Sequence, residues 1–470
     1  MQNKLVFGIH DKPKFGQLIV FAFQQLLAIM AATLVVPILV SQNAGLEGAD
    51  AMSPAAALFG AGVGTLVYQL FTKFRSPVFL GSSFAFIGSM TAAFAGAMSS
   101  VLLGYLGVIL GAVFAGLVYV IIAIVVKFVG VGWINKLMPA AVIGPTVAII
   151  GLSLAGAAIK DVFSYGPQVD KTGPYIMSTS AWASFICAMV SLFVVVLCST
   201  YGKKMAKLIP FIIGILSGYA VALVFTLIGT YAGIDALKVI DFAPFKALTE
   251  GGVGLHTFLS VPEFTFLKAI KGVKDFSWTY VATIAVAYVP VAFVVFAEHI
   301  ADHKNLSTII DKDLLEDPGL HRTLLGDGVG SAAGAIFGGC PNTTYGESVG
   351  CVAITRNASV ATITTTAIMA IVISFISPFV AFLDSIPGCV MGGVCITLYG
   401  FIAVSGLKMI QKVNLEDNAN LFTVSVILIA GIGGMAMAIG KVTLTSIACA
   451  LILGIIVNIV LHAKKTEVDE

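Results

Sequence analysis

The sequence predicts an all-α polytopic membrane protein of about fourteen transmembrane segments. Hydrophobic residues make up 58% of the 470 positions and charged residues 11%, whereas soluble domains carry about 25% charged residues. The mean hydropathy is +1.02. The apolar residues gather in runs of the length that crosses a bilayer, about 20 residues. This composition excludes a single large soluble domain. The lack of a basic patch with interleaved aromatic residues argues against a nucleic-acid partner.

The fourteen segments follow from the apolar runs in chain order. Three of them, 77–99, 323–339 and 341–357, are short, glycine-rich or interrupted. Charged residues precede the first segment, which is longer than the apolar region of a signal peptide, so we interpret it as a membrane helix. The segments are 17–40, 55–72, 77–99, 101–127, 139–158, 178–199, 207–232, 279–303, 323–339, 341–357, 359–383, 387–408, 419–436 and 441–462.

Basic residues in the loops predict the orientation, because cytoplasmic loops carry an excess of lysine and arginine. With the N-terminus inside, 18 of the 26 basic residues fall on the cytoplasmic side. We therefore expect both termini in the cytoplasm and the protein in the lipid bilayer of the cytoplasmic (inner) membrane.

The chain repeats itself weakly. The stretch 139–144 is similar to 387–392, an offset of 248 residues, and 77–84 corresponds to 341–347. Two units of seven segments are implied, and the odd number places the second unit upside down relative to the first. Inverted repeats with matched interrupted helices are typical of secondary transporters, which bind their substrate where the two breaks face each other.

These repeats predict the domain boundaries. A first inverted repeat covers 1–235, an extracytoplasmic connecting loop covers 236–278, and a second inverted repeat covers 279–470.

Ionisable residues inside membrane segments are costly and therefore informative. Glu298 and Asp302 share one face of the eighth segment, and His299 and His303 share the neighbouring face. Two carboxylates on one face repel each other when both are ionised, so the pair is predicted to hold a proton, as a proton-coupled carrier requires. The alternative is that Asp302 and His303 lie solvated at the cytoplasmic end of the helix.

The third and tenth segments contain residues that favour extended backbone. Around 342–346 the sequence is rich in threonine and tyrosine and follows Pro341, which interrupts helical bonding. Two short strands, 78–83 and 342–346, are predicted to pair antiparallel, each followed by a half-helix. Irregular backbone at this depth survives where it lines a cavity, and the half-helix N-termini would point N–H groups into the gap.

A planar nucleobase such as uracil, with two N–H donors and two carbonyl acceptors, suits this gap. The carboxylates of Glu298 and Glu347 can accept from the donors. Backbone N–H groups at Phe84 and Gly346 can bond the carbonyls, and Phe84 and Tyr345 can close over the ring.

The stretch 347–356 resembles the signature of the nucleobase–ascorbate transporter family, which is an acid or amide followed by Asn-x-Gly, then four residues, then Thr-Arg. The blocks 80–86, 297–299, 312–322 and 341–347 are similar to the bacterial uracil permeases of that family. The resemblance covers nearly the whole chain.

The resemblance implies a core domain made from segments 1–4 and 8–11 and a gate domain made from segments 5–7 and 12–14. It also implies proton-coupled import of uracil by a homodimer. Carried over onto this chain, Glu298 and Glu347 would bind the base, and Phe84 and Gly346 would donate backbone N–H groups.

The other carried-over roles concern the ring and the proton. Tyr345 would pack on the base, and Tyr399 in a gate helix would approach it from the other side. Glu298 and Asp302 are assigned to proton coupling, with sodium as the alternative ion. The residues expected to support the site are Gln25, Ser348, Thr355 and Arg356.

The chain departs from the family pattern at three positions. It has Ser348 where many relatives have asparagine, Gln25 where members often have histidine, and Asp302 where close relatives often have histidine. An aspartate can still exchange a proton, but its working pH and its coupling need not match those of relatives with histidine at that position. Arg356 has an alternative role as an anchor on the positively charged cytoplasmic side.

Three other functions are weighed against uracil import. A purine or xanthine carrier of the same family differs in pocket size and edge contacts. An anion transporter of the same architecture would leave the helix N-termini free for the anion, which two carboxylates in the gap argue against. A membrane enzyme is disfavoured because no nucleophile elbow, metal-ligand cluster or cofactor fingerprint occurs. No metal or cofactor is expected, and the seven cysteines are interpreted as packing residues.

Overall fold

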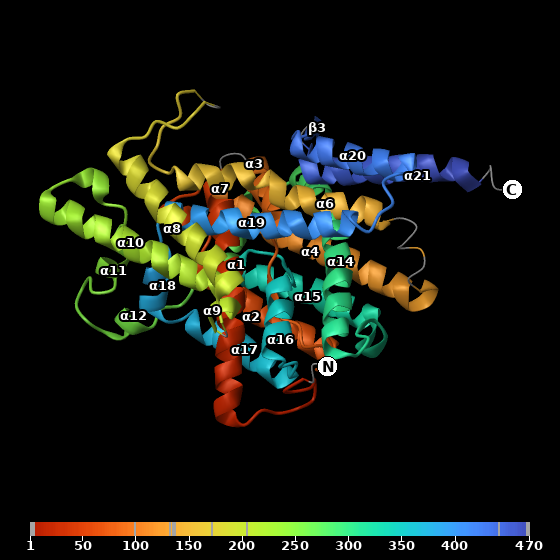
Figure 1. Cartoon of the computed structure of the whole chain (residues 1–470), viewed down its shortest axis with the longest axis horizontal. Helices are drawn as coiled ribbons and strands as arrows, with labels where there is room; N and C mark the ends of the chain where they lie inside the picture. The colour runs from red at the N-terminus through yellow and green to blue at the C-terminus, as the bar shows by residue number, and fades with distance from the viewer. Residues whose placement is uncertain are drawn as a thin grey trace. The chain divides into compact units, whose positions relative to one another are not determined.

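The structure is a computed structural model, and it describes residues 5–97, 100–130, 133, 138–170, 173–203, 205–439 and 442–466 (Figure 1). The chain forms two compact units. The larger unit comprises Met1–Ser153, Pro262–Ile371 and Ile402–Glu470, and the smaller unit comprises Leu154–Val261 and Val372–Phe401. The boundaries of the repeats and the division into core and gate domains stay predictions.

The helical fold class is confirmed. Within the described residues, eight helices are long and apolar enough to cross a membrane, and four shorter apolar helices accompany them. The principal helices of the larger unit are α1 (Phe15–Ala44), α2 (Pro54–Phe71), α3 (Ile87–Gly96), α4 (Val101–Val129), α6 (Ala140–Ser153), α13 (Thr265–Gly272), α14 (Trp278–Ile310), α15 (Leu320–Gly338), α16 (Gly346–Thr355), α20 (Asn418–Ile432) and α21 (Ser446–Thr466).

The remaining principal helices belong to the smaller unit or are divided between the two units. Helices α17 and α19 begin in one unit and end in the other by residue number. The helices are α7 (Ala155–Val162), α8 (Thr179–Tyr201), α10 (Pro210–Ala232), α11 (Ala243–Ala247), α12 (Leu255–Phe258), α17 (Val360–Ile373), α18 (Ser377–Asp384) and α19 (Gly388–Ile410).

The predicted segments coincide with helices or strand–helix pairs, with differences in detail. Segments 139–158 and 359–383 are each divided into two helices, and the loop 236–278 contains short helices. Residues 98–99 and 441, at the ends of two predicted segments, lie outside the described residues.

The eighth segment is longer than predicted. The predicted membrane segment ends at 303, but α14 continues to Ile310. Ser307 and Thr308 donate their hydroxyl protons to the carbonyls of His303 and Lys304, at 2.6 and 3.0 Å. These bonds satisfy the polar side chains within the helix, which then ends at Asp311 in the left-handed conformation, φ 54°.

Serine residues cap the starts of three membrane helices described in the larger unit. The hydroxyls of Ser53, Ser100 and Ser277 accept from backbone N–H groups in the first turns of α2, α4 and α14. Such caps satisfy part of the set of N–H groups that a helix leaves unpaired at its start, so these helices have fixed first turns.

The interrupted third and tenth segments pair as predicted. Strand β1 (Leu80–Ser82) and strand β2 (Asn342–Thr344) are antiparallel, with Gly81 opposite Thr343. Each strand bonds the other within the membrane, where no water is present to do so. A 3₁₀ turn (Phe84–Phe86) and α3 follow β1, and α16 follows β2.

Helices α2 and α15 approach each other through glycine. A Cβ atom on Gly60 would lie 2.4 Å from the carbonyl oxygen of Gly334, and one on Gly64 would lie 2.7 Å from that of Gly330. Close approach of this kind drives helix association in lipid. The side-chain amide of Asn342 donates to the Gly60 carbonyl at 3.0 Å, so β2 is fixed beside this contact.

Candidate functional site

A small cavity in the larger unit lies between the two interrupted segments and α14. Its volume is about 50 Å³. Five of the six residues predicted to bind substrate line it. Tyr399 is the sixth, and it belongs to the smaller unit. The lining residues are Ser83, Phe84, Ala85, Ile150, Glu298, Thr343, Thr344, Tyr345, Gly346, Glu347 and Ile402.

Two carboxylates face this cavity. Glu298 comes from the middle of α14, and Glu347 comes from the first turn of α16. Both residues are partly exposed. Within the described residues, no other side chain forms a hydrogen bond or an ion pair with either carboxylate, unlike the neighbouring Asp302. The cavity therefore holds two acceptor groups that remain available to a ligand.

The first turn of α16 also supplies hydrogen-bond donors. The helix begins at Gly346, and Tyr345 before it gives no side-chain cap. The first N–H groups of a helix have no acceptor within the helix, and the helix dipole places partial positive charge there. The cavity thus combines carboxylate acceptors with backbone donors.

Asp302 lies beside the cavity. The hydroxyl of Thr344 donates to Asp302 Oδ2 at 2.7 Å, which connects α14 to β2. A Cβ atom on Gly346 would lie 4.0 Å from Asp302 Oδ1. The predicted coupling residue is therefore one hydrogen bond away from the strand that lines the cavity.

The ring of Tyr345 is fixed against β1. Its hydroxyl donates to the carbonyl of Ser82 at 2.7 Å, and the residue is buried. A Cβ atom on Gly81 would lie 2.3 Å from the ring. Gly81 therefore provides the space in which the ring lies, and the tyrosine forms a rigid wall of the cavity.

Gln25 and Ser348 form a hydrogen-bonded pair. The side-chain amide of Gln25 donates to Ser348 Oγ at 2.6 Å, and the backbone N–H of Phe79 donates to the same oxygen at 3.3 Å. Both side chains are buried. These two predicted supporting residues join α1, α16 and the chain that enters β1.

The other two supporting residues form contacts at the end of α16. The hydroxyl of Thr355 donates to the Cys351 carbonyl at 2.7 Å. Arg356 ends the helix in the left-handed conformation, φ 56°, and its carbonyl accepts the N–H of Val6 at 2.8 Å. These backbone contacts attach the N-terminal segment to α16.

The two histidines of α14 are buried, which contradicts the alternative that His303 is solvated. Neither has exposed surface. His299 Nδ1 lies 2.6 Å from Asp327 Oδ2, and its Nε2 lies 3.0 Å from Thr323 Oγ1. His303 Nε2 lies 2.8 Å from the hydroxyl of Tyr68. A polar network therefore connects α14 to α15 and α2.

Asp327 and Tyr68 were not predicted to take part in the site. Asp327 is an ionisable residue inside a predicted membrane segment, 323–339, and the cost of burying such a residue was the signal that could have found it. Tyr68 gives no comparable signal, because a tyrosine in an apolar segment is ordinary. In the part of the chain that the structure describes, no group of three or more His, Cys, Asp or Glu side chains is placed to hold a metal ion.

Comparison with known sequences shows that this chain is similar to permeases. Residues 16–440 match the model of a family described as the Permease family. The chain is 36% identical to the uracil permease of Bacillus subtilis (strain 168) over 470 residues, which cover 99% of this chain and 97% of that protein. It is 34% identical to the uracil permease of Escherichia coli (strain K12), with 96% and 93% covered.

Solved structures share the fold at low sequence identity. The transmembrane domain of the cyanobacterium bicarbonate transporter BicA has a TM-score of 0.55 at 14% identity, covering 96% of this chain and 100% of that one. The murine anion transporter Slc26a9, in its inward-facing state, has a TM-score of 0.62 at 10% identity, with 97% and 70% covered.

Proposed function

Because this chain belongs to the Permease family, we propose that it is a multi-pass uracil permease that imports its substrate across the cytoplasmic membrane together with protons. One observation supports the substrate most directly. Glu298 and Glu347 line one cavity and have no other side-chain partner among the described residues. A ligand with two N–H donors at its edge can bond both carboxylates.

Uracil meets the chemical requirements of this cavity. Its two N–H groups suit the two carboxylates, and its carbonyl oxygens suit the amide donors at the start of α16, near Gly346. Tyr345 offers a flat, fixed wall for the ring. The resemblance assigns a second amide to Phe84 and a contact from the gate side to Tyr399.

The cavity volume supports a transport cycle in which the site opens and closes. About 50 Å³ has room for only a few water molecules, whereas pockets for drug-sized ligands measure about 300–1,000 Å³. The walls must therefore separate for a base to enter. We propose alternating access, with the site exposed to one side of the membrane at a time. The homodimer that the resemblance implies stays a prediction.

Proton coupling is proposed for Asp302 and Glu298. They lie one turn apart on α14, and Asp302 accepts a hydrogen bond from Thr344 on β2. A change in protonation at Asp302 alters that bond, and the strand it holds lines the cavity. This contact offers a physical connection between proton binding and the substrate site.

Two other substrates compete with this proposal. A purine or xanthine permease of the same family would use the same carboxylates with a wider cavity. An anion transporter is suggested by the fold of the solved neighbours alone. Carboxylates at the start of a half-helix occupy the position that an anion would take, so Glu347 argues against it.

Binding of labelled uracil to purified variants tests the substrate site. Glu298→Gln and Glu347→Gln each replace a charged acceptor, and we expect binding at least tenfold weaker, since a hydrogen bond to a charged group contributes about 1.5–3 kcal/mol. The matched control is Glu316→Gln, which alters an exposed acid outside the site. Wild-type affinity for uracil in both site variants would contradict the proposal that Glu298 and Glu347 bind the substrate.

Competition and flux measurements test the alternatives. Unlabelled xanthine, adenine, uric acid and ascorbate should compete poorly with labelled uracil. Strong competition by xanthine would favour the purine carrier, and bicarbonate or chloride flux without nucleobase competition would favour the anion transporter. In proteoliposomes, an imposed pH gradient should drive uracil accumulation, and Asp302→Asn should bind uracil but lose this accumulation. Full uptake with sodium and no proton gradient would show that sodium, and not the proton, is the coupling ion.

A further inference from the structure

The N-terminal segment, residues 5–11, pairs with the chain between α16 and the start of α17. The backbone N–H of Ala358 donates to the carbonyl of Phe7 at 2.9 Å, and the N–H of Val360 donates to the carbonyl of Ile9 at 3.0 Å. The two stretches run parallel where they pair. Ala358 and Val360 are buried, so their N–H groups need partners. The N-terminal segment is therefore built into the fold as a short extended stretch.

Side chains on one side of this segment pack against two helices. Ile9 belongs to an apolar cluster, and Leu5 packs against it. Val6 between them is 58% exposed, an alternation that is typical of extended chain covering a core. Side chains of α14, of the turn after it and of α16 contribute to the same cluster, among them Leu306, Ile310, Leu314, Val349 and Val352. The N-terminal segment therefore brings α14 and α16 into one apolar cluster.

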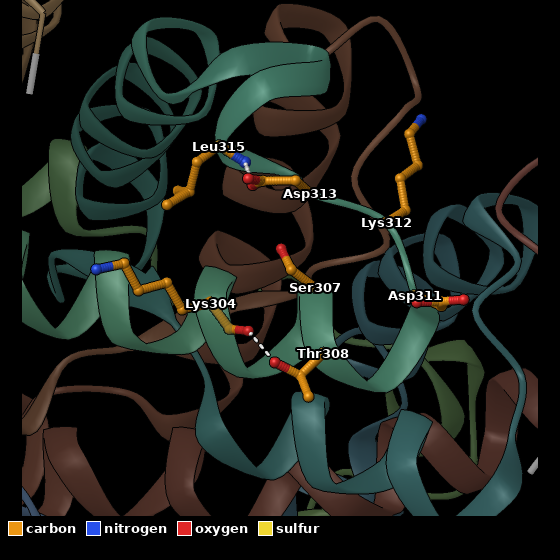
Figure 2. A pocket seen from close by; sticks show the side chains of 7 residues that line it. All are labelled: Lys304, Ser307, Thr308, Asp311, Lys312, Asp313 and Leu315. Carbon is orange, nitrogen blue, oxygen red and sulfur yellow. Dashed lines mark hydrogen bonds between the residues drawn. The ribbon is translucent and has the colours of Figure 1, made fainter. Parts of the chain in front are cut away.

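The end of α14 and the turn that follows it are fixed by their own hydrogen bonds. Ser307 Oγ accepts the N–H of Leu314 at 2.9 Å, and Asp313 Oδ1 accepts the N–H of Leu315 at 2.8 Å. Figure 2 shows the second of these bonds beside the last turns of α14. Leu314 is buried in the apolar cluster. The surface against which the N-terminal segment packs is therefore held in place independently of that segment.

Further contacts attach the N-terminal segment at its other end. The hydroxyl of Ser359 donates to the carbonyl of Asp11 at 2.6 Å. The Asp11 carboxylate accepts the N–H of Gly8 at 2.7 Å, which closes the segment in a turn. The ring of Phe7 meets the ring of Phe21 on α1 edge to face, with 5.8 Å between their centroids. The segment therefore joins α1, the end of α14 and the C-terminal end of α16.

We propose that the N-terminal segment positions Glu347 in the substrate cavity by holding the C-terminal end of α16 against α14. The proposal rests on the proposed function, in which Glu298 on α14 and Glu347 on α16 bind one base between them. Helix α16 has 10 residues and is about 15 Å long, so a shift of its last turn also displaces its first turn, where Glu347 lies. Two carboxylates bond one small ligand only at a fixed separation, and the segment maintains that separation.

Uracil binding by purified full-length variants tests this role. Ile9→Asp places a charge in the apolar cluster, whereas Val6→Asp, the matched control, places the same charge on the exposed side of the same segment. Ile9→Leu keeps an apolar side chain of similar volume. We expect the affinity of the folded protein for labelled uracil to fall about fivefold or more in Ile9→Asp, and to change less than about twofold in Val6→Asp and Ile9→Leu. A merely structural role would lower the yield of folded protein and leave its affinity unchanged.

A shortened chain gives a second test, because a terminal segment can be removed without interrupting the rest of the fold. In this variant the initiator methionine is followed directly by Lys12. We expect it to bind uracil as weakly as Ile9→Asp does. A synthetic peptide with the sequence of residues 5–13, added in excess, should restore the affinity, because the backbone groups of Ala358 and Val360 remain open to pairing. If the shortened chain does not insert, the comparison of Ile9→Asp with Val6→Asp decides.

Hydrogen exchange of the backbone amides tests the segment without any substrate. In Ile9→Asp and in the shortened chain, the amides of α16 should exchange about tenfold faster than in the parent, whereas those of α10 in the smaller unit should keep their rate. Unchanged exchange in α16, parental affinity in Ile9→Asp, or equal weakening by Val6→Asp would overturn the positioning role. Faster exchange in α16 together with no uracil binding by the parent would instead overturn the proposed function and leave the contact intact.

Discussion

His299 Nδ1 lies 2.6 Å from Asp327 Oδ2, and neither side chain has any exposed surface. The pair joins α14, which carries Glu298, to α15. A buried polar group that loses its partner costs about 1–3 kcal/mol. The orientation of α14 next to the cavity therefore depends on this contact.

Replacing Asp327 tests that dependence. Asp327→Leu leaves the histidine nitrogen without its partner, and we expect a loss of about 1–3 kcal/mol in stability, measured by thermal unfolding of the purified protein in detergent. Asp327→Asn keeps an oxygen acceptor at the same place and should lose less. If the leucine variant is as stable as the parent, the pair does not hold the two helices together.

Gly81→Ala should weaken substrate binding through Tyr345. The added Cβ would lie 2.3 Å from the tyrosine ring, so the ring must move, and overpacking of this kind costs about 1–3 kcal/mol. Binding of labelled uracil should weaken at least fivefold. The control is Gly88→Ala, because a Cβ on Gly88 meets nothing within 4 Å. Equal binding by the two variants would contradict a fixed role for the ring.

The contact between Gln25 and Ser348 should appear as an energetic coupling. Ser348→Ala removes the oxygen that accepts from Gln25 at 2.6 Å, and Gln25→Ala removes the donor. A double-mutant cycle on thermal stability should give a coupling of about 0.5–3 kcal/mol, the range for residues in contact. Strictly additive losses would mean that the two residues act independently.

The loop after α14 should respond to acid. Asp317 accepts from Arg75 at 3.1 Å and from Lys312 at 2.7 Å, and these hydrogen bonds hold the pKa of Asp317 below its usual value of 3.8. A carboxyl group whose pKa is lower in the folded state than in the unfolded state stabilises the fold. This stabilisation is complete at a pH above the unfolded pKa, and it is lost as the pH falls through the folded pKa.

Asp317→Asn tests this contribution. Because Asp317 is 44% exposed, the contribution is at most about 1 kcal/mol, and salt should reduce it. The parent should be slightly more stable than the variant above about pH 5, and the two unfolding curves should converge at lower pH. A stability difference that does not shrink as the pH falls, or that grows with added salt, would contradict the ion-pair account.

Much of this protein could be predicted from residue types and their order. Apolar runs of about 20 residues located the membrane segments, because charged and polar side chains are costly in the hydrocarbon core of a bilayer. The proline, threonine and tyrosine residues at 341–345 predicted β2, since they oppose helix formation, and the cost of burying acids singled out Glu298 and Glu347. Each of these signals is local, so the chain alone carries it.

Tertiary structure decided which distant residues meet. No local pattern pairs Gln25 with Ser348 or His299 with Asp327, because such contacts depend on how helices pack across long stretches of sequence. The same holds for Gly81, whose missing side chain makes room for Tyr345 only once β1 lies beside β2.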